Sequence, residues 1–396
     1  MRNTRLKRRM GIALALLCIL LFAALHGLQG TSPLEPSPYN SYTLQALRWR
    51  QGAAALEKDV PHLELAIYKG QYFVSFPPVP GIPVFFLTFL FSENVPDALL
   101  TELYLMGACL LFYGFLARRF APLASMLISF LFCFASSITP IAANGAVWYQ
   151  AQALGFLCIA AAVFLMDKDC PTPALFLYAL SVGCRPFHVL YAVPLFALYC
   201  LRQPSLKACI RKLWPGVALG LIVAASYALY NYVRFDDPLE FGHNHLPEFS
   251  FQGGTQFSFA HIIKNARTFL FSLPFEQTGT GALGFKAFGF SLFLANPALL
   301  FLLVSALYTL ARRHFTLRHA AVFAPFILHT LLLLSHRTVG GFQWGARYFI
   351  DCIPYAFLFL ALTEGSVRTK KGLYALCFAL LPFMVMALMG AQQVHI

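Results

Sequence analysis

Two arginines stand where a cation is unusual: Arg185 interrupts an apolar run, and Arg347 lies in a short turn that we expect on the outer side, where the topological bias disfavours cations. Arg185 precedes a proline in "SVGCRPFHVLYAVP", and Arg347 lies with Arg337 and Trp344 in "HRTVGGFQWGARYFIDCIP". A cation in apolar surroundings costs at least about 3 kcal/mol unless it is paired or hydrated. We therefore predict that Arg185 and Arg347 bind an anionic group such as a lipid phosphate, with Arg337 beside them. The alternatives are a snorkelling or carbonyl-bound Arg185, and a loop that only anchors at lipid headgroups.

An aromatic, lysine-bearing stretch runs directly into a short apolar one in "YKGQYFVSFPPVPGIPVFFLTFLF". We predict that Tyr68, Lys69 and Tyr72, together with Trp344, line the site of a sugar or an acceptor. The apolar run Val79–Phe91 is only about 20 Å long as a helix, too short for a hydrocarbon core of roughly 30 Å. We expect this helix to lie at the membrane interface and to hold the aromatic stretch at headgroup height.

Glu35, in "TSPLEPSPYN", is the candidate catalytic residue. It is the first carboxylate after the first apolar run, and desolvation near a membrane raises a carboxyl pKa toward the range that suits a general base. A merely solvated acid in a proline-rich turn is the alternative.

The segment "DDPLEFGHNH" collects acids and histidines that suit zinc or manganese: Asp236, Asp237, Glu240, His243 and His245. No helical spacing fixes these side chains as ligands, so a solvated loop is the favoured interpretation. We predict no metal site and no cofactor from the sequence, although a divalent cation stays possible.

The segment "AANGAVWYQAQ" presents Trp148, Tyr149 and Gln150 at a membrane boundary. Aromatic rings and an amide can stack on and hydrogen-bond to a sugar. An aromatic belt at the membrane surface predicts the same residues.

The composition requires a membrane to place these residues. The chain has 396 residues, of which 59% are hydrophobic and 11% charged, far fewer charges than soluble domains carry. We predict an all-α polytopic membrane protein forming a single transmembrane domain over residues 1–396, with nine full spans and one broken hairpin. The predicted spans are Gly11–Leu28, Asp97–Leu116, Ala121–Ile138, Ala151–Met166, Leu213–Tyr232, Phe288–Leu310, Ala320–Ser335, Tyr348–Leu362 and Gly372–Met389.

Three segments depart from simple spans. Residues 29–96 and 234–287 are predicted external loops, and in the first of them "YNSYTLQALRWRQG" predicts an interfacial helix ending at Gly52. Residues 174–200 are interrupted at Arg185-Pro186, which predicts two short helices folded as a hairpin. Arg185 would then lie at the apex, facing a water-filled outer cavity.

Most of the 29 lysines and arginines fall in loops on the amino-terminal side, which predicts a cytoplasmic amino terminus and an external active face. Only Asp167, Asp169 and Glu364 oppose them there. This topology accounts for the net charge of +13 without a nucleic-acid partner. The ten cysteines predict no disulfide framework. We expect the first apolar run to be a retained anchor, and no second domain after the last span.

Several of these segments resemble, in order along most of the chain, the GT-C superfamily of integral-membrane glycosyltransferases, in particular bacterial relatives of protein mannosyltransferases and aminoarabinose transferases. The resembling pieces are "YNSYTLQALRWRQG", "AIYKGQYFVSFPPVPGIPVFFL", "SVGCRPFHVLYAVP", "YNYVRFDDPLEFGH" and "GFQWGARYFIDCIPYAFLFL". The resemblance implies transfer of a sugar from a polyprenyl-phosphate carrier to a lipid, glycan or protein acceptor, outside the cytoplasmic membrane of a bacterium. Cations would stabilise the departing phosphate, and an acid of the first loop would act as base.

The sequence departs from that family at one position. The acidic pair that relatives place before the helix-ending glycine falls on Pro38-Tyr39 here. Either Glu35 or another acid of the loop (Glu57, Asp59 or Glu64) takes its place, or this branch uses a different arrangement. A transporter or flippase of lipid-linked sugars, and a non-catalytic member of the fold, are the rival interpretations.

Overall fold

The computed structural model describes residues 2–250, 256–277, 281, 283–338, 340–363 and 369–392. Glu364, one of the predicted cytoplasmic acids, and part of the predicted second external loop lie outside these ranges. The described chain is mostly helical, because a backbone in hydrocarbon must satisfy its own hydrogen bonds.

Six helices are long and apolar enough to cross a membrane. They are α1 (Arg2–Gln29), α4 (Asp97–Leu116), α7 (Val147–Asp167), α10 (Leu206–Phe235), α15 (Leu317–Ser335) and α17 (Lys370–Ala391). The protein is therefore a multi-pass membrane protein, as predicted.

The predicted count of nine spans is not confirmed, because three predicted spans are shorter helices in the structure. They are α5 (Pro122–Phe134), followed by α6 (Ile138–Ala142); α14 (Pro297–Ala311), preceded by α13 (Leu292–Ala295); and α16 (Ile353–Leu362). The last of these is shortened because the preceding residues form the 3₁₀ helix η3 (Arg347–Cys352). A 3₁₀ turn breaks the α-helical hydrogen-bond pattern at that point.

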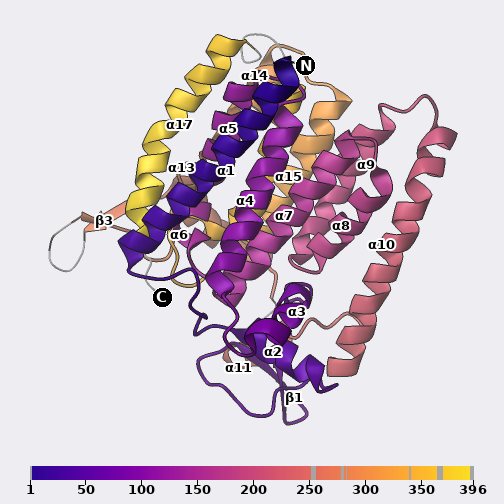
Figure 1. The fold of residues 1–396 in the computed structure, drawn as a ribbon, viewed down its shortest axis with the longest axis vertical. Helices are drawn as coiled ribbons and strands as arrows, with labels where there is room; N and C mark the ends of the chain where they lie inside the picture. The colour runs from indigo at the N-terminus through magenta and orange to yellow at the C-terminus, as the bar shows by residue number, and fades with distance from the viewer. Residues whose placement is uncertain are drawn as a thin grey trace.

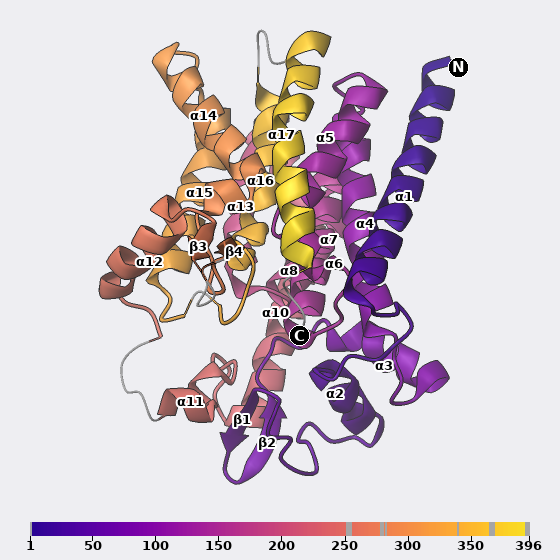
Figure 2. The ribbon, with the colours of Figure 1, turned by 90° about the vertical axis from the view of Figure 1, so that its left-hand side faces the viewer.

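The long helices run side by side along the long axis of the molecule (Figure 1, Figure 2). The amino terminus lies at one end of the bundle. The opposite end, which we call the loop end, carries α2 (Ser41–Arg50), the hairpin β1–β2 (Leu65–Tyr68, Gln71–Val74), α3 (Gly81–Phe91) and α11 (Pro247–Ser250). Figure 2 shows α12 (Phe259–Phe271) and the strands β3 (Phe275–Gln277) and β4 (Leu283–Phe285) on one flank.

The core is centred on α7, the most buried of the six long helices. It packs against α4 at two glycines of that helix. A Cβ atom on Gly107 would lie 3.1 Å from Leu157 Cδ1, and one on Gly114 would lie 2.9 Å from Phe164 Cε2. Small residues at these points let the two helix backbones approach closely.

The interrupted run of residues 174–200 folds as a hairpin. One arm is α8 (Pro171–Val182), and the other is η1 (Pro186–Tyr191) followed by α9 (Ala192–Cys200). Residues 183–185 connect the arms.

The loop end contains strand structure that an all-α prediction misses. The stretch Leu65–Val74 pairs with itself as an antiparallel hairpin. Its turn residues Lys69 and Gly70 have φ angles of 48° and 74°, the left-handed pair that a two-residue hairpin turn uses. The second hairpin, β3–β4, is equally short, and the described residues contain no closed sheet.

A cysteine pair also differs from the prediction. Cys200, at the end of α9, and Cys209, in α10, form a disulfide. The short connection between the two helices brings the Cα atoms of the two cysteines to 5.6 Å.

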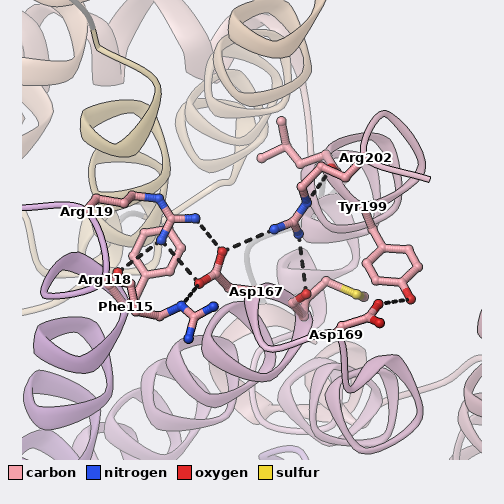
Figure 3. Close-up of polar contacts among 9 residues, drawn as sticks. Phe115, Arg118, Arg119, Asp167, Asp169, Tyr199 and Arg202 are labelled. Atoms are coloured by element: carbon pink, nitrogen blue, oxygen red, sulfur yellow. Dashed lines mark hydrogen bonds and ion pairs between the residues drawn. The ribbon is translucent and has the colours of Figure 1, made fainter. Parts of the chain in front are cut away.

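An ion cluster fastens three helices together at the amino-terminal end (Figure 3). Asp167, the buried last residue of α7, accepts from Arg118 Nε at 2.7 Å, from Arg119, and from Arg202 Nη1 at 3.1 Å. Arg118 and Arg119 follow α4, and Arg202 follows α9. The hairpin arm that leads to Arg185 is thus tied to the central helix at its far end.

Candidate functional site

A cavity of about 1040 Å³ lies at the loop end. The connection between the hairpin arms forms one part of its wall, and the first turn of α7 forms another. Residues 64–77, residues 239–249 and the segment after α15 supply the rest. Its charged lining residues are Arg185, Arg347, Glu64, Glu240, Glu248 and Asp351.

Arg185 enters this cavity from the hairpin connection. The preceding Gly183 is wedged against α10, since a Cβ atom there would lie 2.3 Å from Tyr227 Cζ, and Pro186 then starts η1. Arg185 therefore lies at the break between two helices and not within one continuous helix. Its Nε donates to Asp351 Oδ2 at 2.7 Å, and its side chain keeps 20% exposure. Asp351 thus offsets part of the charge of Arg185, and the arginine side chain still reaches the cavity.

Arg347 reaches the same cavity from the start of η3. Its backbone is held by two amide side chains: Arg347 N donates to Gln343 Oε1 at 3.0 Å, and Gln152 Nε2 donates to Arg347 O at 3.0 Å. The guanidinium lies 5.1 Å from the ring centres of both Tyr149 and Tyr348. The residue is 7% exposed.

Arg347 forms no ion pair within the part of the chain that the structure describes, although its charge acts on Glu64 from a longer distance. No carboxylate lies within 4.0 Å of its guanidinium, and its Nε is buried without a hydrogen-bond partner. A buried cation without a counter-ion is costly, and the two aromatic faces offset only part of that cost. The guanidinium of Arg347 therefore remains a buried cation beside the cavity with no ion-pair partner among the described residues.

Glu64 brings a carboxylate to this cavity. Its Oε2 accepts from Trp148 Nε1 at 3.2 Å, and Ser75 Oγ donates to its backbone oxygen at 2.8 Å. Burial raises the pKa of Glu64 and the charge of Glu248 adds to that rise, whereas the hydrogen bond from Trp148 and the charge of Arg347 oppose it. A carboxyl with a raised pKa suits general-base chemistry.

The position at which the resemblance implies an acidic pair, Pro38-Tyr39, lies beside Trp148, the partner of Glu64. Tyr39 lines the cavity, and its ring lies 5.0 Å from that of Trp148, the residue that binds the Glu64 carboxylate. The hairpin β1–β2 delivers Glu64 to this point, because Glu64 immediately precedes β1. An acid that is remote in sequence therefore occupies the neighbourhood that Pro38-Tyr39 leaves without one.

The other carboxylates of the first loop lie elsewhere. Glu35 is exposed and does not line the cavity. Glu57 pairs with Arg48 at 2.6 Å, and Asp59 is exposed. The predicted catalytic role of Glu35 thus receives no geometric support, and Glu64 is the only acid of this loop in the cavity lining.

The three predicted site residues of the aromatic stretch lie outside the lining, although Phe76 of the same stretch lines the cavity. Lys69 Nζ and Tyr68 Oη bind Asp236 Oδ2 at 2.5 and 3.1 Å, and these contacts lower the pKa of Asp236. Tyr72 lies half-buried in β2. Tyr68 and Lys69 therefore join the hairpin to the chain after α10, Tyr72 pairs with Leu56, and none of the three lines the cavity.

Two predicted site residues of the segment 336–354 do not line the cavity. Trp344 is buried against Phe285, Phe290 and Gly390, away from the cavity lining. Arg337 stacks on Phe249, with its guanidinium carbon 3.7 Å from the ring centre, and so lies behind a lining residue. Of the predicted anion-binding residues, the structure brings Arg185 and Arg347 together.

The acid- and histidine-rich segment forms another part of the cavity wall. His243 and His336 lie with ring centres 5.6 Å apart, and burial together with His336 and Arg337 lowers the pKa of His243 to about 4. Glu240 accepts from Gly242 N and Asn244 Nδ2, which shapes the turn. The described residues contain no group of three histidines, cysteines or acids placed to hold a metal ion.

Two residues of the site were not predicted. Asp351 lies inside a predicted span, and a carboxylate within an apolar run is a signal that could have identified it. Gln152, on α7, binds Asp351 Oδ1 at 3.0 Å as well as Arg347 O. A neutral amide in an apolar helix gave no comparable signal. The neighbouring Gln150 instead binds Asp97, away from the lining.

Comparison with known proteins places this architecture. The sequence matches no family model and no curated protein. The crystal structure of the apo oligosaccharyltransferase of Archaeoglobus fulgidus is similar over 96% of this chain and 56% of its own, with a TM-score of 0.50 and 14% identity.

Two further solved structures are similar. Archaeal oligosaccharyltransferase AglB from Archaeoglobus fulgidus, in complex with an inhibitory peptide and a dolichol-phosphate, has a TM-score of 0.49 and 13% identity, over 98% of this chain and 56% of its own. The Archaeoglobus fulgidus oligosaccharyltransferase tethered to an acceptor peptide containing the NVT sequon has a TM-score of 0.49 and 15% identity, over 96% and 55%. This chain spans about half the length of these proteins. The likeness to the apo enzyme shows that this chain shares the fold of that part of the oligosaccharyltransferase.

Proposed function

We propose that this protein is a glycosyltransferase that moves a sugar from a polyprenyl-phosphate carrier to a lipid, glycan or protein acceptor. The transfer takes place at the loop end, which faces the outside of a bacterial cytoplasmic membrane. Arg347 and Arg185 bind the carrier phosphate, and Glu64 is the general base. Glu64 takes the catalytic role for which the sequence suggested Glu35.

The observation that carries this proposal is the state of Arg347. Its guanidinium is buried beside the cavity, and no described carboxylate neutralises it, so an incoming anion gains a strong charge-assisted interaction. A lipid-borne phosphate is such an anion, and a multi-pass membrane protein meets it at headgroup height. The GT-C fold is consistent with this function.

The chemistry balances with the groups present. The acceptor hydroxyl or amide attacks the anomeric carbon while Glu64 takes its proton, and the bond between that carbon and the phosphate oxygen breaks. The carrier leaves as a polyprenyl phosphate with one more negative charge on phosphate. Arg347 stabilises this growing charge at a site already organised for it.

The charged residues of the cavity have two different roles, proton acceptance by Glu64 and stabilisation of the leaving phosphate by the arginines. Desolvation makes the Glu64 carboxylate a stronger proton acceptor than a solvated glutamate. The arginines act on the leaving group instead. Trp148 and Tyr39, on the side of Glu64, offer rings on which a sugar can stack.

The test compares lipid, glycan and protein extracts of a strain lacking the gene with those of the same strain carrying variants. Wild type restores one glycosylated species by mass spectrometry, Glu35→Gln restores it fully, and Glu64→Gln lowers its amount at least about 100-fold, the usual contribution of a general base. Equal restoration by Glu64→Gln would overturn the assigned base.

The rival function is movement of a lipid-linked sugar without chemistry. Vesicles containing purified protein and a fluorescent polyprenyl-phosphate sugar distinguish the two. A transferase leaves the probe in its original leaflet, and a flippase exposes it to a membrane-impermeant quencher. Leaflet exchange that Glu64→Gln leaves unchanged would contradict the proposed function.

A further inference from the structure

Gln152 connects the two cations of the cavity through a single nitrogen atom. Its Nε2 donates to Asp351 Oδ1 at 3.0 Å and to the backbone oxygen of Arg347 at 3.0 Å. Asp351 in turn accepts from Arg185 through its other oxygen at 2.7 Å. One buried amide of α7 therefore fixes the partner of Arg185 and the backbone of Arg347 together.

The choice of an amide matters for the charge of the site. A lysine at this position would neutralise Asp351, and an acid would repel it. The neutral donor instead orients the carboxylate toward Arg185 and adds no charge near Arg347. The guanidinium of Arg347 stays without a carboxylate partner among the described residues, so its position depends on its backbone and on the faces of Tyr149 and Tyr348.

We infer that Gln152 is a positioning residue that sets the spacing of Arg185 and Arg347 for a bound phosphate. It is 1% exposed and absent from the cavity lining, so it acts only through the two arginines. Without these two hydrogen bonds, the Asp351 carboxylate keeps Arg185 and the more distant His188, and the Arg347 backbone keeps Gln343. The shared link between the two arginines is then lost, and their guanidinium groups no longer meet one anion together. This inference rests on the proposed anion site.

The helix offers a matched control two residues earlier. Gln150 Nε2 donates to Asp97 Oδ1 at 2.6 Å and to Gly145 O at 2.9 Å, the same pair of bond types, and it is equally buried. Its partners do not line the cavity. Gln150→Leu therefore removes the same chemistry from the same helix without touching either arginine.

The experiment measures the affinity of the full-length protein in nanodiscs for undecaprenyl phosphate. We expect Gln152→Leu to weaken binding about tenfold, while Gln150→Leu changes it less than twofold, with both variants monitored for thermal unfolding. Gln152→Glu keeps the shape but places a carboxylate against Asp351, and we expect a larger loss. Equal losses in both leucine variants would show a general effect on α7 and overturn the inference.

A double-mutant cycle provides a readout that a purely structural role would not move. Gln152→Leu and Asp351→Asn act on the same bond, so their effects on phosphate affinity are expected to be non-additive, whereas those of Gln150→Leu and Asp351→Asn add. Additivity in both cycles would contradict the positioning role. Intact binding in Arg347→Gln would reject the anion site itself, so the two failures are distinguishable.

Discussion

Arg185 and Arg347 lie at the same distance from one tyrosine: each guanidinium carbon is 5.1 Å from the centre of the Tyr348 ring. The two cations come from segments more than 150 residues apart in the sequence. Like charges so placed repel each other, and Asp351 relieves only one of them. An anion bound between them relieves both, which explains why the pair is held at a cavity.

The acid side of the pH–rate profile of the transfer reaction should report the deprotonation of Glu64. Burial raises its pKa, so the basic form appears only above the ordinary glutamate value of 4.5. We predict that kcat/KM rises with pH along a limb whose midpoint lies above 4.5, measured from initial rates. A midpoint at or below that value would contradict a desolvated base.

The same shift predicts how stability depends on pH. The folded protein binds a proton at Glu64 more tightly than the unfolded chain, so this group stabilises the fold at low pH and the contribution is lost as pH rises through the raised pKa. Glu64→Gln should therefore raise Tm at pH 8 and leave it unchanged at pH 4. Glu57→Gln, at an exposed ion pair, serves as the control.

Asp167 should matter for stability and not for chemistry. Its removal leaves Arg118 and Arg119, after α4, facing Arg202, after α9, without their shared carboxylate (Figure 3). Breaking a buried ion pair costs about 3 kcal/mol or more, and partial exposure of Arg118 and Arg202 places this cluster at the low end. We predict a lower Tm for Asp167→Asn.

The control for that variant is the neighbouring exposed acid. Asp169 pairs with Lys212 at 2.6 Å on the surface, where such pairs contribute little. Asp169→Asn is therefore expected to change Tm only slightly. Equal effects of the two substitutions would show that the convergence of three arginines on Asp167 has no special role.

The proposed orientation can be tested with one introduced and one native cysteine. Gln71, in the exposed hairpin at the loop end, should react as Gln71→Cys with a membrane-impermeant thiol reagent applied to intact cells. The exposed native Cys170 lies beside Asp167 at the other end and should react only after lysis. The reverse labelling pattern would invert the topology.

The apolar runs of the sequence and their glycine and proline interruptions predict most of the helices. The break at Arg185-Pro186 and the short run after Val79 were visible because proline and length limit a helix. The hairpin Leu65–Val74 was missed, although a Lys-Gly pair between β-forming residues carries a turn signal. The late start of α16 depends on tertiary contacts of Arg347 that no local pattern encodes.

The residues of the site were predictable where a charged side chain stands at an unusual position in the sequence. Arg185 is a cation in an apolar run, Arg347 is a cation in a predicted outer turn, and Asp351 is a carboxylate in a predicted span. Glu64 could not be distinguished from Glu57 or Asp59 by sequence, because only the β1–β2 hairpin brings it to Trp148. Tyr68 and Lys69 have the right chemistry, but the same hairpin turns them toward Asp236.

The measurement that tests the central claim most directly is the affinity of Arg347→Gln for undecaprenyl phosphate in nanodiscs. A hydrogen bond to a charged group contributes about 1.5–3 kcal/mol, so we predict a loss of roughly tenfold to 100-fold. Lys69→Gln, which removes a cation outside the cavity, should bind as wild type does. Unchanged affinity in Arg347→Gln, or an equal loss in Lys69→Gln, would contradict the proposed phosphate site.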